Sequence, residues 1–417
     1  MYLKQRLIAM NFLQFFIWGS WLISIGRFWF DYKGWSSSNF GIIFSTMGIA
    51  SLFMPAIAGI IADRWINAEK LYGAFHICGA IILFILPNIT SPTTFFWVIL
   101  LNMIFYMPTL ALGITVCYSS MKKAKMDIIK DYPPIRVFGT IGFIVALWII
   151  NILKWGDTPN QFYLASAAAL VLGIYSFTMP KCPPLGGGHQ KTFASALGLN
   201  AFKLFKSYKM ALFFLFSMLL GAALQLTNAY GDTFITDFAK DPLYKDSFAV
   251  KYSEIIMSIS QISETLFILA IPFFLRKFGI KKVMLMSMIA WVLRFGLFGL
   301  GNPETGLWMI ILSCIIYGMA FDFFNISGSI YVETQSEPNI RASAQGLFMM
   351  MTNGFGAVAG SLLSGIIIEK YFMSDGVNKD WPEIWFAFAA YALVVAVLFA
   401  VLFKHKHDPK AMENVHH

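Results

Sequence analysis

Long apolar runs recur along the whole chain, each about as long as a helix needs to cross a lipid bilayer. An α-helix rises about 1.5 Å per residue, so roughly 20 residues cross a hydrocarbon core of about 30 Å. Twelve such runs are separated by charged or turn-forming residues. They cover residues 6–30, 38–62, 71–89, 95–118, 133–154, 162–180, 209–236, 254–275, 280–299, 307–332, 344–369 and 383–404. The pattern predicts an all-α integral membrane protein with twelve transmembrane helices.

The composition excludes a soluble globular domain. Of the 417 residues, 58% are hydrophobic and only 13% are charged, whereas soluble domains have about 45–50% apolar and about 25% charged residues. The net charge of +9 is explained by basic residues retained in cytoplasmic loops, so no nucleic-acid partner is expected.

Lysine and arginine are concentrated in alternate connections between the predicted helices. With a cytoplasmic N-terminus, the cytoplasmic segments contain 22 of the 31 basic residues and the external segments contain 7. Because basic residues are enriched on the cytoplasmic side of a membrane, both termini are predicted to lie in the cytoplasm.

The longest of the cytoplasmic connections, 181–208, lies midway along the chain. Pro183, Pro184 and three consecutive glycines at 186–188 predict a flexible linker, and the amphipathic stretch 193–205 is predicted to lie along the membrane surface. We therefore expect an N-terminal six-helix bundle over 1–180, the linker over 181–208, a C-terminal six-helix bundle over 209–404 and a cytoplasmic tail over 405–417. A six-plus-six division indicates two bundles related by duplication.

Polar and aromatic side chains recur within four of the predicted helices, where contact with lipid would be costly. Their spacing of three or four residues places them on one face of each helix. They are Arg136, Thr140 and Phe143 in the fifth helix; Gln225, Asn228 and Asp232 in the seventh; Gln261 and Glu264 in the eighth; and Tyr317, Phe321 and Asn325, with Asp322 beside them, in the tenth.

Two interpretations fit these stripes. Each amide could join neighbouring helices by a hydrogen bond. Alternatively, the mixture of a cation, carboxylates, amides and aromatic rings could line a cavity for an uncharged, polyhydroxylated ligand that carries a planar ring. The mixture of side-chain types favours the cavity.

Glu264 and Asp322 also suggest a source of energy. Burial favours the protonated form of a carboxyl group, so either side chain could bind a proton on one side of the membrane and release it on the other. The alternative is a carboxylate held ionised by a permanent pair with Arg136. The sequence favours proton coupling and leaves open which carboxylate carries the proton.

Signatures of enzymes and metal sites are absent from the sequence. It contains no phosphate-binding glycine loop, nucleophile elbow or pair of zinc ligands. His76 is a lone histidine in the third helix and is interpreted as a packing residue. We therefore expect no enzymatic activity, no metal and no cofactor, with a proton gradient as the energy source.

Several motifs resemble those of known transporters. Gly59, Asp63 and Arg64 after the second helix match the G-x-x-x-D-R turn of the major facilitator superfamily, although the Gly-Arg-Lys that usually follows is missing. Longer segments are similar to the bacterial nucleoside–proton symporters. These segments are FFIWGSW (15–21), YMPT (106–109), PPIRVFGT (133–140), SISQISET (258–265), FDFFNISG (321–328), RASAQG (341–346) and MMTNGFG (350–356).

The resemblance implies proton-driven import of purine and pyrimidine nucleosides, uridine among them, by alternating access in the bacterial cytoplasmic (inner) membrane. It implies a central site, and the family's substrate-binding residues fall on Arg136, Thr140, Phe143, Gln225, Asn228, Gln261, Glu264, Tyr317 and Phe321. We expect the protein to be a monomer. Glu264 and Asp322 are the proton-coupling candidates, and Asp232 receives no role.

Other functions remain open at this point. A xanthosine-selective relative, a sugar–proton symporter or a drug exporter would share the fold, and a receptor that binds nucleosides without transport belongs to another class. Saturable uridine binding without accumulation would indicate the receptor.

Overall fold

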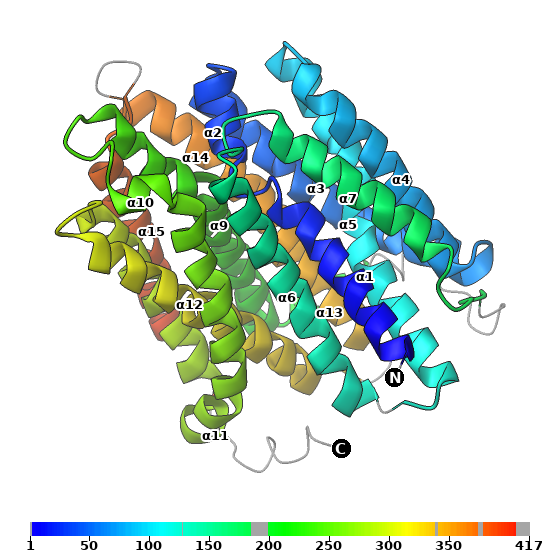
Figure 1. Ribbon diagram of the computed structural model, residues 1–417. Coiled ribbons are helices and arrows are strands. Elements are labelled where there is room, and N and C mark those ends of the chain that lie inside the picture. The colour runs from blue at the N-terminus through cyan, green and yellow to red at the C-terminus, as the bar shows by residue number, and fades with distance from the viewer. Residues whose placement is uncertain (1, 127, 185–198, 338–340, 374–377, 406–417) are drawn as a thin grey trace. The chain divides into compact units, whose positions relative to one another are not determined.

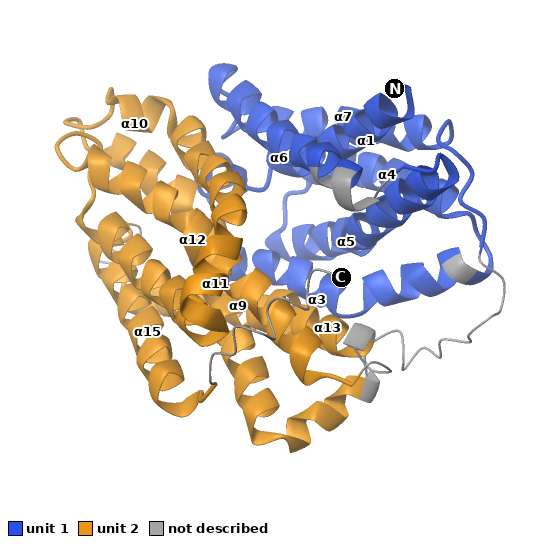
Figure 2. Ribbon diagram, turned by 90° about the horizontal axis from the view of Figure 1, so that it is seen from below, with its two compact units in different colours: residues 1–197 blue, residues 198–417 orange. Residues whose placement is uncertain are grey.

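A computed structural model describes residues 2–126, 128–184, 199–337, 341–373 and 378–405. The chain divides into two compact units, Met1–Leu197 and Gly198–His417 (Figure 2). This division falls inside the predicted linker 181–208, of which 185–198 lie outside the described residues. The predicted tail, apart from His405, also lies outside them.

The first unit is built from helices (Figure 1). They are α1 (Tyr2–Gly19), α2 (Ile25–Arg27), the π-helix η1 (Phe28–Tyr32), α3 (Ser37–Arg64), α4 (Ala68–Ile85), the 3-10 helix η2 (Leu86–Asn88), α5 (Pro92–Lys123), α6 (Ile128–Ile152) and α7 (Asn160–Ser176). The local sequence explains where α5 begins. Pro92 stands in its first turn, where the missing N–H of proline removes no helical hydrogen bond.

The second unit is also helical. It contains the 3-10 helix η3 (Leu199–Lys206), α9 (Tyr208–Asp237), the 3-10 helix η4 (Phe238–Lys240), α10 (Phe248–Lys251), α11 (Ser253–Leu300), α12 (Leu307–Gln335), α13 (Arg341–Met349), the π-helix η5 (Met350–Gly356), α14 (Ala357–Tyr371) and α15 (Trp381–Leu402). The long element α11 is two helices joined at Gly279, whose φ of 76° is left-handed and favours glycine. The break separates the predicted eighth and ninth spans.

Lengths and compositions agree with a membrane protein. Among the described residues, nine helices are long and apolar enough to cross a bilayer, with α11 counted once. Three further segments are not counted separately among the nine: the broken first span, the 17-residue α7 and the second half of α11. With these three, the helical segments agree with the twelve predicted runs. The only β pairing among the described residues is an isolated bridge between Met373 and Lys379. The all-α transmembrane fold is confirmed.

The first predicted span, 6–30, is wrong as a continuous helix. The α-helix ends at Gly19, and the chain passes through a turn at 20–24 before α2 and η1. Gly19 lies against the backbone of Phe143, from which a Cβ atom would be only 2.6 Å away. The Ser20 hydroxyl donates to the Phe16 carbonyl over 2.8 Å, and the backbone N–H of Ser20 donates to the same carbonyl over 3.0 Å.

Helices pair in the same pattern within each unit. In the first unit, the first span packs on the fifth (α1 on α6), the second on the fourth (α3 on α5) and the third on the sixth (α4 on α7). In the second unit, α9 packs on η5 and α14, and α11 packs on both α12 and α15. The repeated pairing is what duplication of a six-helix unit would produce.

Glycines allow the paired helices to touch along their backbones. Gly142 of α6 faces the carbonyl of Phe12 on α1, and Gly221 of α9 faces the carbonyl of Thr352 on η5. Gly360 of α14 would place a Cβ atom 2.6 Å from the Cα atom of Ala222. Small residues at such contacts let membrane helices approach closely.

Candidate functional site

Two carboxyl groups, Glu264 and Asp322, lie on helices of the second unit that touch beside them, so two negative charges there would repel each other. Glu264 is on the first half of α11 and Asp322 is on α12, where its side chain is buried. Tyr317 stands on α12 immediately before Gly318, the residue that contacts the backbone of Glu264. A proton bound by either carboxyl group would remove the repulsion.

The proximity of these carboxylates follows from a glycine. Gly318 lies one turn before Asp322, and a Cβ atom placed on it would be 2.6 Å from the carbonyl group of Ser263 and 2.7 Å from the amide nitrogen of Glu264. The Ser263 hydroxyl also donates to the carbonyl of Ile315. The two helices therefore touch through backbone atoms beside the charged groups.

The ring of Tyr317 is fixed on several sides. Phe321 lies parallel to it, with an interplanar angle of 7° and centroids 5.8 Å apart, and Trp291 meets it edge to face at 6.0 Å. The Cζ atom of Arg294 lies 4.7 Å from the ring centroid. Such an arrangement restrains the orientation of the tyrosine hydroxyl.

A small concavity lies beside this cluster within the second unit. Phe321 and Asn325 of α12 line it, together with Trp291 of α11 and with Thr352 and Asn353 of η5. Sequence reasoning identified Phe321 and Asn325 but missed the η5 residues. The available signal in the sequence was the polar pair Thr352-Asn353 inside an apolar run. The structure adds that η5 is a π-helical segment, a feature often found at functional sites.

The α9 stripe is partly buried. Gln225 and Asp232 are buried, and Asn228 is half-buried. The Oε1 atom of Gln225 has no hydrogen-bond partner within the described part of the chain. A buried amide oxygen without a protein partner is suited to accept a hydrogen bond from a ligand. Gln261 lies three residues before Glu264 on α11 and is half-buried.

In the first unit, Arg136 of α6 stacks on α1. Its Cζ atom lies 4.1 Å from the ring centroid of Phe15, a distance at which the face of an aromatic ring attracts a cation. Gly139 provides the space, because a Cβ atom there would be 2.7 Å from the Phe15 ring. Thr140 is half-buried one turn beyond Arg136, and Phe143 is buried next to Gly19.

A polar network that sequence reasoning missed is centred on Gln14 of α1. Its Oε1 atom accepts a hydrogen bond from the Tyr72 hydroxyl over 2.6 Å and lies 2.8 Å from Nε2 of His76, while its Nε2 atom donates to the Thr109 hydroxyl over 2.9 Å. Tyr106 donates to the Gln14 carbonyl over 2.8 Å. His76 is thus a satisfied packing residue, as predicted. The pair of amides Asn11 and Gln14, three residues apart in an apolar run, was the available signal.

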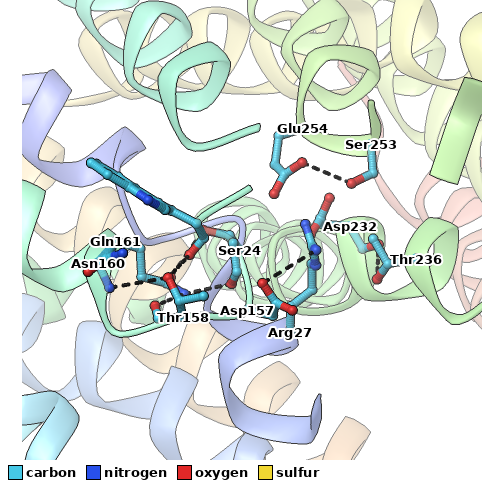
Figure 3. Close-up of polar contacts among 12 residues, drawn as sticks. Ser24, Arg27, Asp157, Thr158, Asn160, Gln161, Asp232, Thr236, Ser253 and Glu254 are labelled. Atoms are coloured by element: carbon cyan, nitrogen blue, oxygen red, sulfur yellow. Dashed lines mark hydrogen bonds and ion pairs between the residues drawn. The ribbon is translucent and has the colours of Figure 1, made fainter. Parts of the chain in front are cut away.

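Arg27 forms an ion pair in the first unit. Its Nη2 atom lies 3.9 Å from Oδ1 of Asp157, beside a hydrogen bond of 3.1 Å from the Ser24 hydroxyl to Oε1 of Gln161 (Figure 3). In the second unit, the backbone carbonyl of Asp232 accepts a hydrogen bond from the Thr236 hydroxyl over 3.1 Å. These bonds explain some of the polar side chains at helix ends.

The predicted residues therefore fall into local groups. Glu264, Tyr317, Phe321 and Asp322 are brought together within the second unit, with Gln261 one turn from Glu264. Arg136 and Phe143 both lie against α1 within the first unit. Each group combines aromatic faces with polar or charged atoms, which can stack a planar ring and bind hydroxyl groups.

Comparison with known proteins gives one consistent result. A family model described as "Nucleoside H+ symporter" matches residues 1–408. The chain is similar to the xanthosine permease of Escherichia coli (strain K12), with 51% identity over 99% of both chains, and to the nucleoside permease NupG of the same organism, with 48% identity over 100% of both. A crystal structure of the nucleoside transporter NupG has a TM-score of 0.92 at 48% identity and covers 97% of this chain and 100% of that one. The chain belongs to the nucleoside H+ symporter family.

Proposed function

We propose that this protein imports purine and pyrimidine nucleosides together with protons by alternating access. The observation that carries the proposal is the group formed by Glu264, Tyr317 and Asp322 in a chain of this family. Two carboxyl groups that repel each other beside a restrained aromatic ring provide a place for a proton next to a place for a ligand.

Each proposed substrate contact uses chemistry that the side chain offers. Phe143 and Phe321 contact the base or shape the space around it, since aromatic faces stack on planar rings. Amide, carboxylate and hydroxyl groups bind the ribose and the edges of the base. The proposed substrate-binding residues are Arg136, Thr140, Phe143, Gln225, Asn228, Gln261, Glu264, Tyr317 and Phe321.

Energy comes from the proton gradient, with Glu264 and Asp322 as the groups that bind the proton. The protein needs no cofactor or metal in this scheme. We place it as a monomer in the bacterial inner membrane. Both termini lie in the cytoplasm in this proposal, because the basic residues are concentrated in the segments assigned to that side.

Uptake of radiolabelled uridine into proteoliposomes tests the proposal. We expect accumulation when the outside is more acidic than the inside, and its loss when a protonophore removes the gradient. Liposomes without protein provide the control. Saturable uridine binding with no accumulation under the gradient would instead indicate a receptor.

A preference for xanthosine is the second candidate, because identity to the xanthosine permease is 51% and identity to the nucleoside permease is 48%. Competition separates the two. Unlabelled xanthosine, adenosine, cytidine and a hexose are added to the uridine assay. Inhibition by xanthosine alone, with little uridine uptake, would favour the selective transporter.

A further inference from the structure

Arg294 is a buried cation for which the proposed transport mechanism has no role. It lies six residues before the end of α11, about 9 Å along the helix axis, and 0% of its surface is exposed. A guanidinium group keeps its charge under physiological conditions. Charged side chains inside membranes are costly and usually serve a purpose.

The contacts of Arg294 hold three helices in register. Its Nε atom donates to the Thr227 hydroxyl of α9 over 3.1 Å, and its Nη1 atom donates to the Ser313 carbonyl of α12 over 2.7 Å. The Ser313 hydroxyl donates in return to the Arg294 carbonyl over 2.9 Å. The bonds of Nε and Nη1 fix the plane of the guanidinium group, while Nη2 has no hydrogen-bond partner within the described part of the chain.

The guanidinium group of Arg294 lies against two aromatic rings. The Cζ atom lies 4.9 Å from the ring centroid of Phe298 and 4.7 Å from that of Tyr317. Ser313 stands one turn before Tyr317 on α12, so the arginine holds both the backbone and the ring of the same stretch of helix.

We infer that Arg294 is a positioning residue of the transport site, which acts by holding the ring of Tyr317 in the orientation that the substrate requires. The inference rests on the proposed function. It requires the flat face and the divergent donors of a guanidinium group, and a lysine, which carries the same charge on one compact ammonium, cannot replace them. Arg294 itself does not touch the nucleoside.

The Arg294→Lys variant tests the requirement for the guanidinium group. We expect the KM for uridine to rise roughly tenfold, the order expected from losing one ring contact and one hydrogen bond. The maximal rate per folded molecule stays within about twofold. Arg276→Lys is the matched control, because Arg276 is an exposed arginine on the same element whose Nε atom bonds only to the nearby Pro272 carbonyl. It leaves the KM unchanged.

A double-mutant cycle tests whether the effect passes through the tyrosine. In a Tyr317→Leu background, which lacks the ring, Arg294→Lys raises the KM less than twofold further. Thr227→Val provides a second variant that keeps the arginine and removes one of its hydrogen-bond acceptors. It raises the KM by a smaller factor, and it decides the question if Arg294→Lys or the double variant does not fold.

The outcomes separate this inference from the proposed function. An unchanged KM in Arg294→Lys would overturn the inference, as would an unchanged KM in Thr227→Val where the Arg294→Lys protein does not fold. The inference would also be overturned if Arg294→Lys raised the KM by the same factor in the Tyr317→Leu background as in the wild-type protein. A fall only in the amount of folded protein would show that Arg294 merely assembles the helices. Failure of the wild-type protein to take up uridine would contradict the proposed function, and the inference with it.

Discussion

Replacing Gly318 by alanine would separate the two carboxylates by displacing one backbone from another. The added Cβ atom would lie 2.6 Å from the carbonyl group of Ser263, whereas ordinary contacts of this kind begin near 3.4 Å. The first half of α11 must therefore move away from α12 by roughly 0.8 Å, or the contact remains strained. Overpacking of this kind costs about 1–3 kcal/mol, which corresponds to roughly 5- to 150-fold in an equilibrium constant.

Separation of the two helices relieves this strain, so the arrangement with Glu264 beside Tyr317 and Asp322 becomes less populated by up to that factor. We expect proton-driven uptake of uridine per folded molecule to fall accordingly. Initial rates are measured in proteoliposomes with an imposed pH gradient and normalised to the amount of folded protein. Gly296→Ala is the matched control, because it is also a helical glycine of the second unit and a Cβ atom there meets nothing within 4 Å. Equal uptake by the two variants would refute the role assigned to the backbone contact.

Three other expectations concern separate parts of the molecule. Glu264→Gln or Asp322→Asn should reduce gradient-driven accumulation more than equilibrium exchange of labelled uridine, and equal loss of both activities would assign that carboxylate to binding or folding instead. Gln14→Met leaves the side chains of Tyr72 and His76 buried without the Oε1 acceptor, so the unfolding temperature in detergent should fall by roughly 5–10 °C. An unchanged unfolding temperature would contradict the importance of the network. Burial raises the pKa of the Cys182 thiol above its ordinary value of 9.0, so alkylation of Cys182, followed by mass spectrometry, should be slow at pH 7.5 and accelerate as the pH rises past 9; rapid alkylation at pH 7.5 would contradict the burial.

The helices could be predicted from the sequence because the bilayer imposes their length. The predicted run 307–332 corresponds to α12, which continues to Gln335, and the boundary between 254–275 and 280–299 corresponds to the break at Gly279. The turn after Gly19 could not be predicted in this way. It depends on the close approach of α6, which is a tertiary contact and leaves no mark on the apolar pattern of α1 itself.

Helical spacing identified residues that share one helix face, such as Tyr317 and Phe321, but it could not identify partners on other helices. Arg294 lies in a run with no polar residue at the spacing that would mark a stripe, and only the structure brings it to Thr227 and Tyr317. Gln14 was missed although Asn11 stands three residues before it, because its partners on other helices lie far along the chain.

The Gln14 network has a consequence for biosynthesis. Gln14 donates to Thr109, 95 residues later, and Asn11 donates to the Sγ atom of Cys117, 106 residues later. The ribosome therefore makes α1 well before α5 supplies these acceptors. We expect α1 to stay beside the insertion machinery until α5 emerges, so that a nascent chain stopped before residue 92 would leave its first helix poorly inserted.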